Sequence, residues 1–206
     1  RQAFPYYEEA GVGRDDGKEK GEYAAILIDR RRLELIEQGT FWFSETPDAV
    51  ASTSWGNEIP RIATWVRLAD RNRGQDFYAY NVHWDHVSQN SREKSGQLLI
   101  QRIAALGEAP VVVTGDFNAD EQNPAFRTLL ASSDVPLVDT FRQAHPDAQN
   151  VGTFHGFRGG RRGGKIDAVL ASGAWRTVDA QIVDDSFDGR YPSDHYPVAA
   201  TLRWKP

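Results

Sequence analysis

The stretch Thr114-Gly115-Asp116-Phe117-Asn118 decides how this sequence folds and what chemistry it can carry. It follows the apolar run Val111–Val113, which predicts a fully buried strand that ends in an acid and an amide. Residues i and i+2 share a face of an extended chain, so Asp116 and Asn118 can point at one ligand. There a carboxylate can hold or deprotonate a water, and an amide can hydrogen-bond a phosphate oxygen. The alternative is an ordinary turn, because Gly, Asp and Asn are turn formers.

A second polar motif, Ser193-Asp194-His195, lies between Pro192 and Pro197. Proline restricts the backbone, which helps to preorganise the adjacent polar side chains. Asp194 offers the oxygen ligands that hard divalent cations bind, and His195 can act as a base or a phosphate contact near neutral pH. Taken alone, a surface loop with a solvated acid explains this segment better.

Asp167 is the third candidate and lies inside the strand-like stretch Lys165–Leu170. Aspartate is depleted in strands, so an acid at this position needs a partner. Orienting a histidine is a common use of such an acid. An edge-strand acid that faces water explains Asp167 equally well on local grounds.

A fourth polar cluster is Asn81-Val82-His83-Trp84-Asp85-His86, again at a strand end. Two histidines and an acid this close are candidate metal ligands, although only His83 and Asp85 share a face of an extended chain. A lone histidine is more often structural, and we take His83 as functional because of the other three motifs. The four sites together, without cysteine or a serine nucleophile elbow, indicate hydrolysis by a metal-activated water rather than covalent catalysis.

The surrounding sequence predicts a single α/β domain over residues 1–206, with no repeat and no linker. Asn90 and Glu93 have the spacing of a helix capping box, and Gly107 suits the end of that helix. The first 22 residues are polar and glycine-rich, so we expect a loop there. The other predicted elements are a helix at 124–130 and strands at 23–28, 41–43, 62–68, 77–83, 110–114, 165–170, 181–183 and 198–202.

The composition narrows the function classes. The 206 residues include no cysteine, which excludes disulfides, zinc–thiolate sites and thiol nucleophiles. The net charge of −5 argues against a dedicated non-specific DNA binder and suits a site that collects divalent cations. No apolar run approaches the ~20 residues of a membrane helix, and the sequence does not fix the compartment. The absence of methionine leads us to expect a processed or partial chain.

These motifs resemble those of the endonuclease/exonuclease/phosphatase superfamily, the group that includes DNase I. The resemblance implies a four-layered α/β sandwich, in which two packed mixed β-sheets are flanked by helices. Its motifs are specific for the superfamily and say little about the substrate. Four signatures carry it: Asn81-Val82-His83, Gly115–Asn118, Lys165-Ile166-Asp167 and Ser193-Asp194-His195. Three upstream segments resemble a bacterial subgroup of metal-dependent hydrolases: Gly13–Gly17, Gly21-Glu22 and Phe41–Pro47.

The resemblance also implies roles for the residues near the strand ends. Asp116 orients and activates the attacking water, and Asn118 contacts the scissile phosphate. His195, oriented by Asp167, contacts the phosphate or acts as a base.

A further set of residues is expected to hold the metal and the substrate. Asp194 is the implied metal ligand, and the implied ion is Mg²⁺ or, less often, Mn²⁺ or Ca²⁺. His83 is expected to stabilise the phosphate or the leaving group, with Glu22 as its carboxylate partner. Three basic residues are candidates for substrate binding: Arg14, Arg162 and Lys165. Arg162 and Lys165 lie in a glycine-rich stretch, which is equally well explained as a solvated loop.

One departure from the family pattern concerns the N-terminus. Family members begin with a strand that ends in Asn and continue to a strand that ends in Gln-Glu, whose Glu is the principal metal ligand. Nothing in residues 1–22 matches either, and Glu8 and Glu9 lie in no such strand pattern. By family analogy we expect about the first 60 residues of the domain to be missing, so that one sheet has a gap.

Three functions follow from these observations. The first is a monomeric phosphoesterase that acts on a small or short phosphodiester or phosphomonoester, since no basic stripe with interleaved aromatics marks a long nucleic-acid track. The second is a nuclease of the same superfamily that acts on DNA or RNA. The third is a degenerate, non-catalytic binding module, which the missing N-terminal motifs favour and the retained polar motifs oppose.

Overall fold

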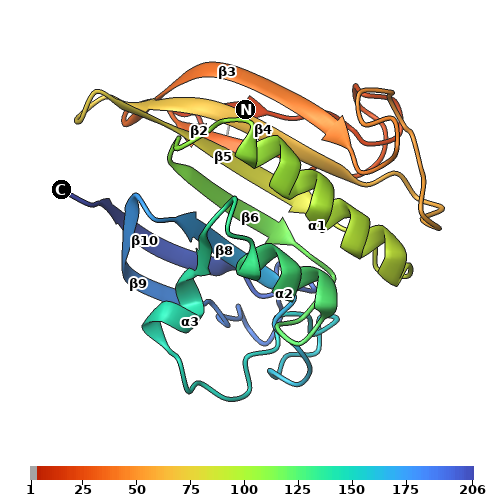
Figure 1. Cartoon of the computed structure of the whole chain (residues 1–206). Helices are drawn as coiled ribbons and strands as arrows, with labels where there is room; N and C mark the ends of the chain where they lie inside the picture. Colours follow the sequence, from red (N-terminus) through yellow and green to blue (C-terminus); the bar gives the residue numbers. More distant parts are fainter. Residues whose placement is uncertain (1–3) are drawn as a thin grey trace.

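The computed structural model describes residues 4–206 as a mixed α/β structure (Figure 1). Strands predominate, and the three helices all come from the C-terminal two-thirds of the chain. In chain order the elements are β1 (Tyr7–Ala10), β2 (Ile26–Asp29), β3 (Leu33–Trp42), β4 (Ile62–Asp70), β5 (Gln75–His83), α1 (Gln89–Ala104), β6 (Val111–Asp116), α2 (Pro124–Ala131), β7 (Leu137–Asp139), α3 (Thr140–Ala144), β8 (Asp167–Ser172), β9 (Trp175–Ile182) and β10 (Val198–Trp204).

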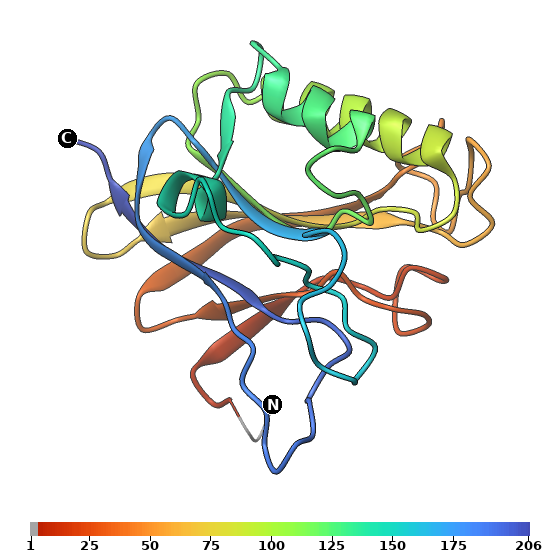
Figure 2. The ribbon, with the colours of Figure 1, turned by 90° about the horizontal axis from the view of Figure 1, so that it is seen from below.

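A six-stranded mixed sheet forms the centre of the molecule, with strand order β3-β4-β5-β6-β8-β7. Only β5 and β6 pair in parallel, and the other neighbours pair antiparallel. Parallel neighbours need a crossover connection, which α1 supplies. Figure 2 shows α1 and α2 together on one face of this sheet. None of the helices in the described residues is long and apolar enough to span a membrane.

The main apolar core lies between the sheet and these two helices. Leu99 and Ile103 of α1 are buried against it. Trp84, Phe117 and Phe126 pack edge to face in a row, with ring centroids 5.0 and 5.1 Å apart. Such aromatic pairs add to the free energy of burial. Trp84 follows β5 and Phe117 follows β6, so this row anchors the polar ends of both strands.

The opposite face of the sheet carries two small antiparallel sheets, β1–β2 and β9–β10. The expected architecture has two mixed sheets and four layers, whereas residues 4–206 form helices, one mixed sheet and two separate strand pairs (Figure 2). The short helix α3 packs through Phe141 against Ala180 and Ile182 of β9. A groove of about 530 Å³ lies between the large sheet and β9–β10.

Two local predictions are wrong. The cap of α1 is Ser88, whose side chain accepts a hydrogen bond from the Ser91 backbone N–H, and Asn90 lies within the first turn. Asp85 accepts hydrogen bonds from the backbone N–H groups of residues 87 and 88, which holds the chain extended at the cap. Tyr7–Ala10, expected to be loop, is a strand because it pairs along its whole length with β2. Its side chains are mostly exposed, so no apolar alternation marks it.

Gly115 determines how closely β5 and β6 approach. Its φ is +143°, and a Cβ atom at this position would lie 2.0 Å from the Val82 carbonyl oxygen. No other residue type fits such a contact. The register places His83 beside Asp116, so two polar strand ends face one another across the parallel pair.

Candidate active site

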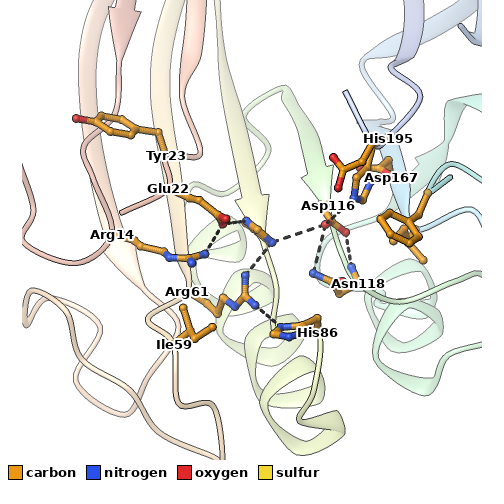
Figure 3. A pocket seen from close by; sticks show the side chains of 14 residues that line it. Arg14, Glu22, Tyr23, Ile59, Arg61, His86, Asp116, Asn118, Asp167 and His195 are labelled. Atoms are coloured by element: carbon orange, nitrogen blue, oxygen red, sulfur yellow. Dashed lines mark hydrogen bonds and ion pairs between the residues drawn. The ribbon is translucent and has the colours of Figure 1, made fainter. Parts of the chain in front are cut away.

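The ends of β5, β6 and β8 open into a cleft of about 640 Å³ (Figure 3). The four polar motifs of the sequence therefore meet in one place. The cleft is lined by Arg14, Glu22, Tyr23, Ile59, Arg61, His83, His86, Asp116, Asn118, Phe154, Ile166, Asp167, Asp194 and His195.

One side of the cleft, here called the acidic wall, consists of Asp116, Asp167, Asp194 and His195. His195 Nδ1 lies 2.8 Å from Asp167 Oδ2, and this hydrogen bond raises the pKa of His195. His195 Nε2 lies 3.9 Å from Asp116 Oδ2. Burial, followed by the negative charge of Asp167, raises the pKa of Asp116 to about 6. The wall thus holds a carboxylate and an imidazole whose proton affinities are both increased.

The amide of Asn118 is oriented by its neighbours. The residue has φ +45°, and its backbone N–H donates to Asp116 Oδ1 at 2.8 Å. Its side-chain Nδ2 donates to the Trp84 carbonyl at 2.9 Å and to Asp116 Oδ2 at 3.3 Å. To donate to a phosphate oxygen, Asn118 must therefore release the longer of these two bonds.

The acidic wall can hold a divalent metal ion. Ligand atoms of Asp116, Asp167 and His195 all lie within 4.8 Å of one another. Two carboxylates suit Mg²⁺ or Mn²⁺, which commonly bind one or two protein carboxylates together with substrate phosphate. Asp194, the ligand expected from the sequence, lines the same cleft but does not belong to this three-residue group.

The opposite side, here called the basic wall, consists of Arg14, Glu22, Arg61, His83 and His86. Arg14 Nη1 donates to Glu22 Oε2 at 2.5 Å, and the same oxygen lies 3.4 Å from His83 Nδ1. Glu22 is therefore adjacent to His83, the neighbour that the family resemblance implied. Burial, followed by the positive charge of Arg61, lowers the pKa of His83 to about 3.

Arg61 is the centre of the basic wall and is only 3% exposed. Its Nε donates to Asp85 Oδ1 at 3.1 Å, and its Nη1 and Nη2 lie 2.8 Å from His83 Nε2 and 2.6 Å from His86 Nδ1. Sequence reasoning missed this residue because a lone arginine before a strand forms no motif. The only available signal was strand pairing, since Ile62 lies opposite His83.

The two remaining basic candidates lie outside the cleft. The Lys165 ammonium is fully buried and donates to Asp139 Oδ2 at 2.5 Å. This corrects its assignment as a substrate-binding residue, because an enclosed and paired amine cannot reach a ligand in the cleft. Arg162 is exposed and does not line the cleft, so its role stays a prediction.

Aromatic and aliphatic side chains on the rim were also not foreseen. Phe154 is 51% exposed, and its ring lies against His195 with centroids 5.0 Å apart. A backbone bridge joins the same two residues. Tyr23 and Ile59 line the cleft as well, and both are partly exposed. Single exposed apolar residues carry no signal in a sequence, so only the structure could identify this rim.

The sequence profile of the "Endonuclease/Exonuclease/phosphatase family" matches residues 24–195. No curated protein sequence matches the chain. Among solved structures, an endonuclease/exonuclease/phosphatase family protein from Bacteroides thetaiotaomicron is similar at 32% identity and a TM-score of 0.90, covering 100% of this chain and 78% of that one.

Two further solved structures place the fold in context. A mannosyl-6-phosphatase from Bacteroides thetaiotaomicron VPI-5482 is 32% identical with a TM-score of 0.88, and the match covers 98% of this chain and 79% of that one. The catalytic domain of human Nocturnin is 16% identical with a TM-score of 0.75, over 99% of this chain and 74% of that one. At that identity the second likeness concerns the fold alone.

Proposed function

The chain belongs to the endonuclease/exonuclease/phosphatase family, and from this premise we propose that it is a metal-dependent phosphoesterase. The observation that carries the proposal is the pairing of opposite charges across one cleft. The acidic wall can hold a divalent cation, and the guanidinium of Arg61 lies at the centre of the basic wall. A phosphate group bound between them would be neutralised from both sides.

The residues of the acidic wall suit the attack of water on phosphorus. Asp116, with a pKa of about 6, is a carboxylate at neutral pH and can orient or deprotonate the attacking water. If the cation is held by the carboxylates of the acidic wall, His195, held by Asp167, is free to donate a proton or hydrogen bond to the phosphate. When bound, Mg²⁺ or Mn²⁺ would polarise a phosphate oxygen and stabilise the developing charge. In this proposal Asp194 assists in metal binding.

A small phosphomonoester is the substrate class that we favour, acted on by a monomer. The 32% identical mannosyl-6-phosphatase supports a phosphorylated sugar. In the basic stretch near residue 160, Arg161 is not free for a nucleic acid, because its Nη2 is bound to Asp184 Oδ2 at 2.9 Å and to the Ile182 carbonyl.

The test is hydrolysis of four substrates with Mg²⁺ or Mn²⁺: mannose 6-phosphate, p-nitrophenyl phosphate, bis-p-nitrophenyl phosphate and a DNA or RNA oligonucleotide. We expect phosphate release from the monoesters, and its loss in EDTA. Preference for the oligonucleotide would establish the nuclease instead. Activity unchanged by EDTA would exclude the metal mechanism, and no activity on any substrate would favour the binding module.

Metal binding can be measured separately from turnover. Mg²⁺ usually needs one or two well-placed carboxylates plus phosphate, so we expect residues 1–206 alone to bind it weakly. Calorimetric titration of this chain, beside a form extended at its N-terminus by natural sequence, tests the predicted missing ligand. Equal affinity in the two forms would show that residues 1–206 contain the whole metal site.

A further inference from the structure

We propose that His86 is a substrate-binding residue, whose ring N–H donates a hydrogen bond to a hydroxyl of the substrate beyond the scissile phosphate, and that Arg61 positions it. The proposal rests on the phosphoesterase function and adds the class of leaving group, a polyhydroxylated one. His86 lines the basic wall, away from the carboxylates of the acidic wall (Figure 3).

The hydrogen bond with Arg61 determines which ring nitrogen of His86 carries the proton. Arg61 Nη2 lies 2.6 Å from His86 Nδ1. A guanidinium has five N–H donors and no acceptor, so Nδ1 must offer its lone pair. The proton of the neutral ring is therefore on Nε2. The same reasoning applies to His83, whose Nε2 accepts from Arg61 Nη1 at 2.8 Å and whose proton is on Nδ1, facing Glu22.

The two histidines differ in where their N–H groups point. The N–H of His83 lies beside Glu22 Oε2, at an Nδ1–Oε2 distance of 3.4 Å. The side chain of His86 is 53% exposed, and no residue within 4–206 accepts a hydrogen bond from its Nε2. His86 thus offers an unused donor to the cleft, whereas His83 is engaged on both ring nitrogens.

The ring of His86 is held by a chain of buried contacts. Arg61 is fixed through Nε by Asp85, which is 2% exposed. Asp85 Oδ2 in turn accepts from the backbone N–H groups of Val87 and Ser88, at 3.0 and 2.6 Å. A donor supported in this way keeps its direction before the substrate arrives, which reduces the entropy lost on binding.

The position of His86 favours a contact with the leaving group rather than with the scissile phosphate. Asp116 Oδ2 lies 3.7 Å from His83 Nε2, and Arg61 lies between His83 and His86. The side chains of His83 and Arg61 therefore separate His86 from Asp116, the residue proposed to activate the attacking water. A sugar phosphate carries hydroxyl groups at such a distance from phosphorus, whereas p-nitrophenyl phosphate carries none.

Two variants separate the donor from the acceptor function of the ring. His86→Asn keeps an oxygen near the Nδ1 position, which can accept from Arg61, but has no donor at the Nε2 position. His86→Gln places an amide N–H near Nε2 and lacks the Nδ1 acceptor. The measurement is kcat and KM for mannose 6-phosphate and for p-nitrophenyl phosphate. Each variant is made both in residues 1–206 and in the form extended at its N-terminus.

We expect His86→Asn to lower kcat/KM for mannose 6-phosphate about tenfold, the effect of one lost hydrogen bond, and to leave p-nitrophenyl phosphate within about twofold. His86→Gln, which restores the donor but not the contact with Arg61, should recover part of the loss. An equal loss on both substrates, no loss on either, or a larger loss in His86→Gln than in His86→Asn would overturn the proposal.

A second measurement does not depend on turnover. The ¹⁵N spectrum of the histidine rings should show protonated Nε2 and unprotonated Nδ1 for His86 at neutral pH. Mannose 6-phosphate should shift the Nε2–H resonance, and inorganic phosphate should not. The reverse tautomer, or no shift with the sugar phosphate, would disprove the role of His86. If the resonances shift as expected but no phosphate is released, His86 binds the sugar phosphate and the proposed hydrolase activity is wrong.

Discussion

The acidic wall and the basic wall each contain one histidine near Asp116, and the two histidines have opposite proton affinities. The hydrogen bond from Asp167 raises the pKa of His195, whereas burial and the charge of Arg61 lower the pKa of His83 to about 3. The same side chain is therefore suited to carry a proton on one wall and is held neutral on the other. Burial and neighbouring groups, more than residue type, set the proton affinity of a histidine in this cleft.

The largest expected effect comes from removing the chemistry of the acidic wall. Asp116→Asn and His195→Ala should each lower kcat about 10²–10⁴-fold, because each removes a group that acts on the reacting atoms. Initial rates of phosphate release with saturating Mg²⁺ measure the effect. Asp179→Asn, an exposed acid on β9, is the matched control and should keep the wild-type rate. Near-normal activity in Asp116→Asn would remove this residue from the mechanism.

The next largest effect concerns the stability of the basic wall. Arg61→Met leaves Asp85 buried without its ion-pair partner, and such a change typically lowers the free energy of unfolding by about 3–5 kcal/mol. Urea unfolding monitored by circular dichroism measures it. Arg61→Met combined with Asp85→Leu should recover part of the loss, because no unpaired charge remains buried. A loss below about 1 kcal/mol in the single variant would show that water reaches this ion pair.

The opposite pKa shifts of the two histidines predict opposite pH dependences of stability. Between about pH 6.5 and the folded pKa of about 3, the unfolded chain binds a proton at His83 that the folded chain does not, so His83 lowers stability as the pH falls. The pKa of His195 is raised in the folded protein, so protonated His195 stabilises the fold. This stabilisation is fully present below the pKa of the unfolded chain, about 6.5, and is lost as the pH rises through the folded pKa.

His83→Gln removes the loss of stability that His83 causes on acidification. The free energy of unfolding of the variant minus that of the wild type should therefore increase by about 1.4 kcal/mol for each pH unit between about pH 6.5 and about pH 4. His195→Gln should instead be more destabilised at low pH than at high pH. Urea unfolding of the three proteins across this range is the measurement. Stability curves that run parallel to that of the wild type would show that the two walls do not differ in proton affinity.

The smallest effect separates the observed helix cap from the predicted one. Ser88→Ala removes the cap of α1, next to the loop that carries His86, and should cost about 1 kcal/mol of stability. Asn90→Ala should cost less, because Asn90 only makes a 3.3 Å bond from its exposed amide. Thermal unfolding can rank the two variants, and the reverse order would support the cap predicted from the sequence.

The acidic wall was predictable because each of its members stands at the end of an apolar strand or beside a stiff proline. Asp116 and Asn118 are marked by the valine run, and Asp167 by its rarity within a strand pattern. The hydrogen bond between His195 and Asp167 connects residues 28 positions apart, and it was expected from the family resemblance rather than from either motif alone.

The basic wall was largely not predictable, because its residues acquire their roles only through strand pairing. Arg61 meets His83 across β4 and β5, and nothing near Pro60 in the sequence suggests this. Lys165 is the opposite case. It lies beside Asp167 in the sequence, yet its ammonium is buried against Asp139 and does not reach the cleft. In both cases the long-range contact, absent from local patterns, decides whether a cation serves the cleft or the core.

The lack of a side chain at Gly115 has a consequence for how this cleft can diversify. Any Cβ atom there would collide with the Val82 carbonyl, so β5 and β6 cannot move apart or together by substitution without breaking their pairing. A side chain at position 115 would therefore disturb the strand pairing that sets His83 beside Asp116. Arg14, Tyr23 and Phe154 lie outside this contact, so the rim of the cleft can vary without disturbing its floor.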